Sequence, residues 1–132
     1  MPYVVAYVAT AVVFFALDFA WLSTQLGLYR RELGSLLLDQ PNLGIAAVFY
    51  LLYVAGIVFL AIHPALRDGN WVGVLLAGAV LGLVAYGTYD ITNLSTVRGW
   101  SPTIAIIDMV WGTALTAVSA TAGYLVTKWL FP

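Results

Sequence analysis

Cysteine is absent from the sequence, and charged residues are scarce. The 132 residues contain no Cys and a single His, and Asp, Glu, Lys and Arg together make up 8% of the chain. Without Cys, disulfides, thiolate catalysis and Cys-ligated zinc or iron–sulfur centres are excluded. The net charge is -1 and there is no basic run, which argues against a nucleic-acid partner.

Hydrophobic residues dominate the chain instead. They make up 63% of it, whereas a soluble domain is at most about half apolar and about a quarter charged. Because a membrane-spanning helix needs about 20 apolar residues, the length accommodates four spans with short connectors. We therefore expect an all-α integral membrane protein, an antiparallel four-transmembrane-helix bundle with a short interfacial segment between helices 1 and 2. Residues 1–132 are expected to form a single membrane domain, with spans at about 3–29, 43–66, 71–94 and 102–130.

Three of the six acidic residues lie inside these spans, towards the same end. At a helical rise of about 1.5 Å per residue, Asp18 lies roughly 16 Å, and Asp108 roughly 9 Å, from the end that carries connectors 1–2 and 3–4. Asp90 precedes Arg98 by eight residues and so lies near that end too. An ionisable group at membrane depth is a functional-site hypothesis by default. If the protein is an enzyme, Asp90 is the candidate catalytic centre, tuned by Asp18 and Asp108.

Aromatic and amide side chains accompany the acids. Tyr86, Asp90 and Asn93 have the i, i+4, i+7 spacing of one helix face, and Trp21 and Trp111 each follow an acid by three residues. We expect a polar pocket in one leaflet whose ligand-binding candidates are Tyr50, Tyr86, Tyr89, Asn93, Trp21 and Trp111. The alternative is a hydrogen-bond network that only fixes helix packing, although such bonds average less than about 1 kcal/mol each.

Two other features are less informative about function. His63 lies about 30 Å from the Asn42 end of its span at helical rise, so it cannot join the acids, and we expect no metal site. Whether the protein binds a cofactor is unknown from the sequence. Gly78 and Gly82 form a GxxxG pair, which fits either packing inside the bundle or a dimer face.

Several blocks of the sequence resemble a known family. These are Leu17-Asp18-Phe-Ala-Trp21-Leu22, Phe49-Tyr50-Leu-Leu-Tyr53, Tyr86-Gly-Thr-Tyr-Asp90-Ile-Thr-Asn93-Leu and Asp108-Met-Val-Trp111-Gly112. They are similar to a bacterial family of predicted membrane proteins catalogued as domain of unknown function 2177, and the resemblance covers nearly the whole chain. It implies a four-span, multi-pass protein of the bacterial inner membrane, and it brings no activity, substrate or cofactor with it.

Three functions fit these patterns. The first is binding of, or catalysis on, a lipid-soluble or amphipathic small molecule in the polar pocket. The second is a small proton-coupled transporter, although its path would need access from both sides. The third is an accessory subunit of a larger membrane complex. The lipid bilayer is the expected partner, and a homo-oligomer or a larger complex stays open. Arg30, Arg31 and Arg98 against Arg67 and Lys128 favour connectors 1–2 and 3–4 in the cytoplasm.

Overall fold

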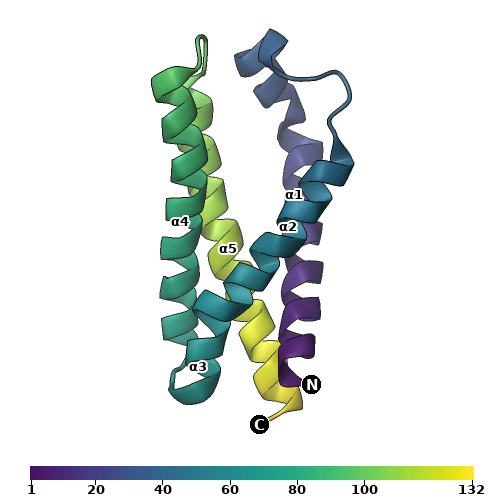
Figure 1. Ribbon diagram of the computed structural model, residues 1–132, viewed down its shortest axis with the longest axis vertical. Helices are drawn as coiled ribbons and strands as arrows, with labels where there is room; N and C mark the ends of the chain where they lie inside the picture. The colour runs from purple at the N-terminus through teal and green to yellow at the C-terminus, as the bar shows by residue number, and fades with distance from the viewer.

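The computed structural model consists of helices joined by short connectors (Figure 1). It describes the backbone of residues 1–132 and every side chain except that of Asp68. The elements are α1 (Pro2–Leu33), the 3₁₀ turn η1 (Gly34–Leu36), α2 (Leu43–Ile57), the π-helical turn η2 (Val58–Ile62), α3 (His63–Asp68), α4 (Trp71–Thr96) and α5 (Pro102–Leu130).

Four helical stretches are long and apolar enough to cross a membrane. They are Pro2–Leu36, Leu43–Arg67, Trp71–Thr96 and Pro102–Leu130, and the described chain contains no strand. The expected class, an all-α membrane protein with four spans, is therefore confirmed.

Side-chain caps begin three of the helices. The side-chain oxygens of Asn42, Asn70 and Ser101 accept hydrogen bonds from the backbone N–H groups of Ile45, Gly73 and Ile104, respectively. Such caps satisfy amides that have no partner within the helix. They explain why each of these spans begins directly after a short polar connector.

Helix α1 continues further than the expected end of span 1 near residue 29. It includes Arg30, Arg31 and Glu32 and ends at Gly34, which has a φ of +48°. Arg and Glu are good helix formers, so charge alone does not end the helix. The segment between the first two spans is consequently shorter than expected, with one 3₁₀ turn followed by residues 37–42.

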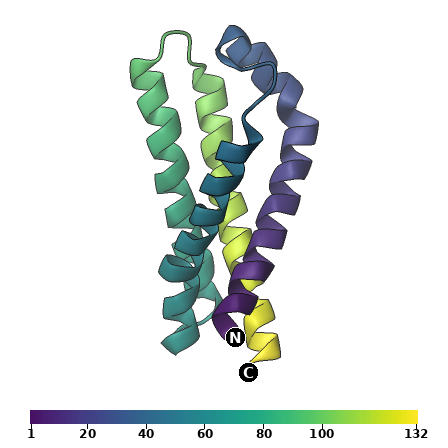
Figure 2. The same cartoon turned by 45° about the vertical axis from the view of Figure 1, so that its right-hand side comes forward.

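The second span is helical from Leu43 to Asp68 but is interrupted by the π-helical turn η2, directly before Pro64. Pro64 has no N–H to donate to the preceding turn, and such a gap in the helical ladder is a recognised cause of kinks. Figure 1 shows α2 crossing the molecule diagonally, and Figure 2 shows it passing in front of α5.

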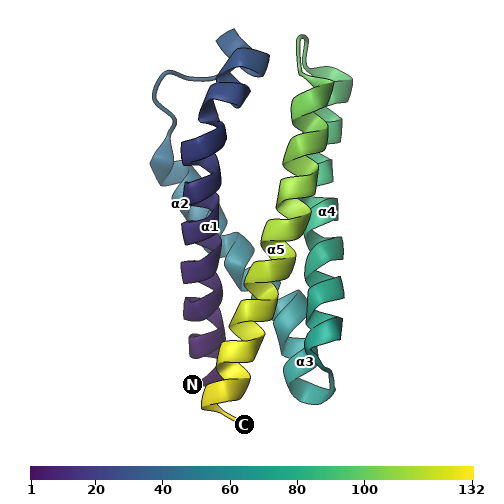
Figure 3. The same ribbon diagram turned by 180° about the vertical axis from the view of Figure 1, so that it is seen from behind.

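Helices α4 and α5, joined by residues 97–101, lie side by side near this connector and move apart towards the end that holds both termini (Figures 1 and 3). Glycines allow this close approach. A Cβ at Gly78 would lie 2.9 Å from Ala117 Cα, and one at Gly82 would overlap the carbonyl oxygen of Gly112. The GxxxG pair of α4 is thus buried against α5 within the chain.

Helices α1 and α5 converge at the end that holds both termini and diverge towards the connectors (Figure 3). At the terminal end a Cβ on Gly123 would overlap the Thr10 hydroxyl, so small residues let the backbones meet. Towards the connectors the indoles of Trp21 and Trp111 are stacked, with ring centroids 4.4 Å apart. Side-chain size therefore increases along the interface, and the two helices separate accordingly.

Candidate functional site

A cavity of about 470 Å³ lies towards the end that carries the connectors. All four spans contribute to it, and so do both connectors at that end. Its lining consists of Tyr29, Leu33, Leu37, Ala46, Phe49, Tyr50, Tyr53, Ala85, Tyr86, Tyr89, Asp90, Trp100, Ile104 and Asp108.

Aromatic rings form much of this lining. Five of the lining residues are tyrosines, and Phe49 and Trp100 add two further rings. Tyr50 and Tyr53 on α2, like Tyr86 and Tyr89 on α4, are three residues apart and therefore share a helix face.

Ring–ring contacts and one hydrogen bond order the deep part of the cavity. Tyr53 meets Tyr86 edge to face at a centroid distance of 6.3 Å. Its hydroxyl also forms a 2.8 Å hydrogen bond with Thr116 Oγ1. Fully buried Phe14 packs edge to face against Tyr50 and Tyr53. The deep end of the cavity is thereby supported by packed side chains of α1, α2, α4 and α5.

Two carboxyl groups stand together in the wall. Asp108 on α5 lies beside Asp90 on α4. One Asp108 oxygen, Oδ1, accepts a 2.9 Å hydrogen bond from the Tyr29 hydroxyl. Asp90 is fully buried, and neither of its oxygens meets an amide, hydroxyl or indole donor; its polar neighbour is the Asp108 carboxyl, which can bond to it only if one of the two acids is protonated. Buried polar groups are nearly always paired, so Asp90 is an exception that requires an explanation.

Positive charge is missing from the cavity. Among the side chains that the structure describes, no Lys, Arg or His lines it. Arg30 donates to the backbone carbonyl of Asp39 at 3.3 Å, and Arg98 is exposed. The two carboxyls of the cavity therefore have no cationic side chain facing them there.

A chain of side chains beside the cavity positions Tyr29. Trp21 Nε1 donates to the Tyr29 hydroxyl at 3.2 Å, and Tyr29 in turn donates to Asp108. Trp111 Nε1 donates to Asp18 Oδ1 at 3.2 Å. Each indole thus bonds to a group other than the acid three residues before it. Of these five residues, only Tyr29 and Asp108 line the cavity.

The structure divides the candidate residues into two sets. Asp90, Asp108, Tyr50, Tyr86 and Tyr89 line the cavity. Asp18 is buried beside it, bonded to Trp111, and Trp21 is stacked on Trp111. Asn93 is half-buried near the end of α4, where its backbone carbonyl accepts from Val97, and it does not line the cavity.

Sequence reasoning did not include several lining residues. Tyr29 lies at the expected end of span 1, yet α1 continues beyond it to Leu33 and Tyr29 lines the cavity. Tyr53 could have been predicted from the sequence, because it lies three residues after the candidate Tyr50 and so shares its helix face. Phe49 and Trp100 have no comparable pattern, and only the fold brings them to the cavity.

His63 lies at the opposite end of the second span from the connector 1–2 end. Its Nδ1 is 2.6 Å from the Tyr3 hydroxyl, and the two rings are 5.4 Å apart. Among the described residues, no group of three or more His, Cys, Asp or Glu is arranged to hold a metal ion. The chemistry of the cavity is thus that of carboxyl, phenol and indole groups.

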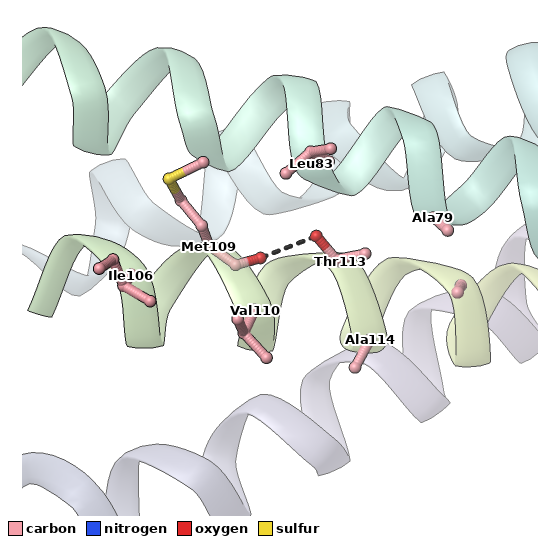
Figure 4. A pocket seen from close by; sticks show the side chains of 8 residues that line it. Ala79, Leu83, Ile106, Met109, Val110, Thr113 and Ala114 are labelled. Atoms are coloured by element: carbon pink, nitrogen blue, oxygen red, sulfur yellow. Dashed lines mark hydrogen bonds between the residues drawn. The ribbon is translucent and has the colours of Figure 1, made fainter. Parts of the chain in front are cut away.

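A second hollow, of about 460 Å³, lies between α4 and α5 and is almost entirely apolar (Figure 4). Its lining consists of Ala79, Leu83, Ile106, Met109, Val110, Thr113, Ala114 and Ala117. Its one hydroxyl, on Thr113, donates to the Met109 carbonyl at 2.8 Å, as Figure 4 shows. The lining of this hollow therefore has no free side-chain hydrogen-bonding group.

Comparison with known proteins places the chain in a family. The family described as "Predicted membrane protein (DUF2177)" matches residues 3–125. No curated protein matches the chain, and no solved structure does. Because the match covers nearly the whole sequence, this four-span, multi-pass membrane protein belongs to the DUF2177 family of predicted membrane proteins.

Proposed function

We propose that the cavity between the spans binds a lipid-soluble or amphipathic small molecule. The observation that carries this proposal is Asp90, whose carboxyl is fully buried in the cavity wall with a second carboxyl, Asp108, as its polar neighbour and no other hydrogen-bond donor. Burying such a group unpaired costs several kcal/mol, roughly 2–7 for a neutral polar group and more for a charge. A ligand that supplies the missing partner would offset that cost.

The size and lining of the cavity support a small-molecule ligand. Its volume of about 470 Å³ falls within the range of roughly 300–1,000 Å³ typical of ligand pockets. Such pockets combine aromatic walls with a few polar groups, and this one has seven aromatic rings and two carboxyls. The indole N–H of Trp100 is also buried without an acceptor, so the wall contains an unpaired donor as well.

The depth of the cavity favours binding from one leaflet over a path through the membrane. Its deepest α2 residue, Tyr53, is eleven residues beyond Asn42, or roughly 16 Å at helical rise. That is about half of a hydrocarbon core of about 30 Å. Phe49 and Tyr89 are 59% and 54% exposed, so they form a rim that a molecule dissolved in the bilayer can reach.

The alternative of a purely structural network accounts less well for Asp90. The neighbouring Asp18 shows what such a network provides, because it accepts a hydrogen bond from Trp111 on another helix. Asp90 has no such donor. A group retained for helix packing alone is expected to be paired, since an interhelical bond stabilises the bundle only if both partners are present.

We further propose that the protein lies in the inner membrane of a bacterium, with the cavity towards the cytoplasm. Three arginines, Arg30, Arg31 and Arg98, lie in or beside the connectors at the cavity end, whereas Arg67 and Lys128 lie at the other. Excess Lys and Arg mark cytoplasmic connectors. A ligand would then enter from the cytoplasmic leaflet.

Mass spectrometry of molecules that co-purify with the detergent-solubilised protein tests the proposal. Asp90→Asn keeps the shape of the side chain and removes its charge. We expect a small molecule bound to the wild type to be lost from Asp90→Asn and retained by Asp39→Asn, which alters an exposed acid outside the cavity. If nothing specific is bound and Asp90→Asn changes only thermal stability, the acids are a scaffold and the proposal is wrong.

A further inference from the structure

We propose that the cavity is selective for an organic ammonium group attached to an apolar body. This inference rests on the proposed function and specifies the chemical class of the ligand. Its basis is the juxtaposition in one cavity of two neighbouring carboxyls, Asp90 and Asp108, with a set of aromatic rings and no cationic side chain among the described lining residues.

The arrangement of the acidic pair is the first argument. Asp90 is fully buried without an amide, hydroxyl or indole donor, while Asp108 beside it is only half-buried. Of the two Asp108 oxygens, only Oδ1 accepts a hydrogen bond from a described side chain. The only other group placed to donate to Asp108 is Asp90 when that acid is protonated, so a ligand with N–H donors can bond to both carboxyls once they are ionised. An ammonium there would supply both the N–H donors and the positive charge that buried acids require.

The aromatic lining is the second argument. Faces of Tyr, Phe and Trp rings attract cations, and cages of such rings are the usual recognition device for organic ammonium groups. Tyr29 bonds to Asp108 itself, and Tyr50, Tyr86 and Tyr89 line the same cavity. Neighbouring rings hold two of these in place, because Tyr89 packs edge to face on Trp100 at 5.5 Å and Tyr86 on Tyr53.

The same features disfavour a phosphate or a carboxylate on the ligand. An anionic group would lie near two Asp carboxyls with no Lys, Arg or His among the described residues of the lining. Like charges within one cavity repel each other strongly where little water is present to screen them. An ammonium occurs both in free lipophilic amines and in the headgroup of phosphatidylethanolamine. Because no Lys, Arg or His among the described lining residues could pair with the phosphate of that headgroup, the phosphate-free amine is favoured.

Octylammonium and octan-1-ol are suitable probes, because they share an apolar chain and differ in charge. Octylamine is protonated at pH 7, as a Lys side chain is. The full-length protein would be purified in micelles of dodecyl maltoside, a nonionic detergent that carries no ammonium, and binding measured by titration calorimetry with subtraction of empty micelles. We expect wild type to bind octylammonium at least about tenfold more tightly than octan-1-ol, as for hydrogen bonds to charged groups.

Variants assign this preference to the acidic pair. We expect Asp90→Asn and Asp108→Asn to remove the preference for octylammonium while octan-1-ol binding stays within about twofold. Asp39→Asn, an exposed acid outside the cavity, should keep the preference. The two variants lie on different helices, so the test can still be made if one of them fails to fold. Size-exclusion chromatography shows whether each variant is folded. A preference that persists in both Asn variants would overturn the inference.

Other outcomes separate this inference from the proposed function. Equal binding of octylammonium and octan-1-ol would overturn the ammonium inference and leave a small-molecule cavity. Binding of neither probe, together with no co-purifying molecule, would overturn both. Phosphatidylethanolamine added to the micelles should leave octylammonium binding unchanged. If it competes, the occupant is the lipid headgroup, and the preference for a phosphate-free amine is wrong.

Discussion

The contact between Trp111 and Asp18 ties α5 to α1 at the point where the helices begin to separate. Trp111 Nε1 donates to Asp18 Oδ1, and the indole also stacks on Trp21. Asp18 is 7% exposed, so water cannot readily replace this donor. A buried acceptor that loses its partner retains its desolvation cost.

Trp111→Phe is therefore expected to lower the free energy of unfolding by about 1–2 kcal/mol, because it removes the N–H and keeps most of the ring. Thermal or denaturant unfolding in detergent, followed by circular dichroism, measures this. The control is Trp129→Phe, since Trp129 is 79% exposed and has no described hydrogen bond. Equal stability of the two variants would mean that the Asp18 contact contributes nothing.

At the scale of the helices, the seam between α4 and α5 depends on glycine more than on any polar bond. A Cβ added at Gly112 would overlap the ring of Tyr86, a lining residue of the cavity. Gly112 is buried on α5. The close packing of this seam therefore also fixes the position of one cavity wall.

We expect Gly112→Ala to destabilise the protein by about 1–3 kcal/mol through overpacking and to displace Tyr86 into the cavity. Gly56→Ala is the matched control, because a Cβ at Gly56 in α2 would meet nothing within 4 Å. That change should be neutral or stabilising by up to about 1 kcal/mol, as for Gly replaced within a helix. The melting temperatures of the two variants measure this difference. A Gly112→Ala variant as stable as the wild type would contradict close packing of Gly112 against Tyr86.

The helices could be predicted from sequence to different degrees. The apolar runs identify the four spans because a bilayer requires about 20 apolar residues to cross it. The end of α1 was placed too early, since Arg30, Arg31 and Glu32 continue the helix. The π-helical turn before Pro64 was not expected. Hydropathy averages over a window and cannot detect a local change in the hydrogen-bond ladder.

At the scale of the whole molecule, the cavity exists because α1 and α5 diverge. Counting residues from the connectors could place Asp18, Asp90 and Asp108 towards one end. It could not show which of them face a common space, because that depends on where small residues such as Gly123 let helices meet and where Trp21 and Trp111 stand between them. The functional roles of all these residues stay predictions.

The orientation of the molecule in the membrane is open to a direct test, since the chain contains no Cys. Single Cys residues at Gly99 and at Pro132 would report on opposite ends, because Gly99 lies in the connector between α4 and α5 and exposed Pro132 follows α5 at the end that holds both termini (Figure 3). A Cβ at Gly99 would meet no other atom within 4 Å. Its φ of +81°, however, is a backbone conformation that favours glycine. Ser35, in η1 and exposed, is therefore the better site at the cavity end.

With three arginines at the cavity end, the positive-inside rule places that end in the cytoplasm. In intact bacterial cells, a membrane-impermeant maleimide should therefore label Pro132→Cys and leave Ser35→Cys unlabelled until the cells are lysed. The reverse pattern would place the cavity on the outer leaflet, so that its ligand would come from outside the cell. Labelling of both sites in intact cells would indicate that the chain inserts in both orientations, as the small difference of three arginines against Arg67 and Lys128 permits.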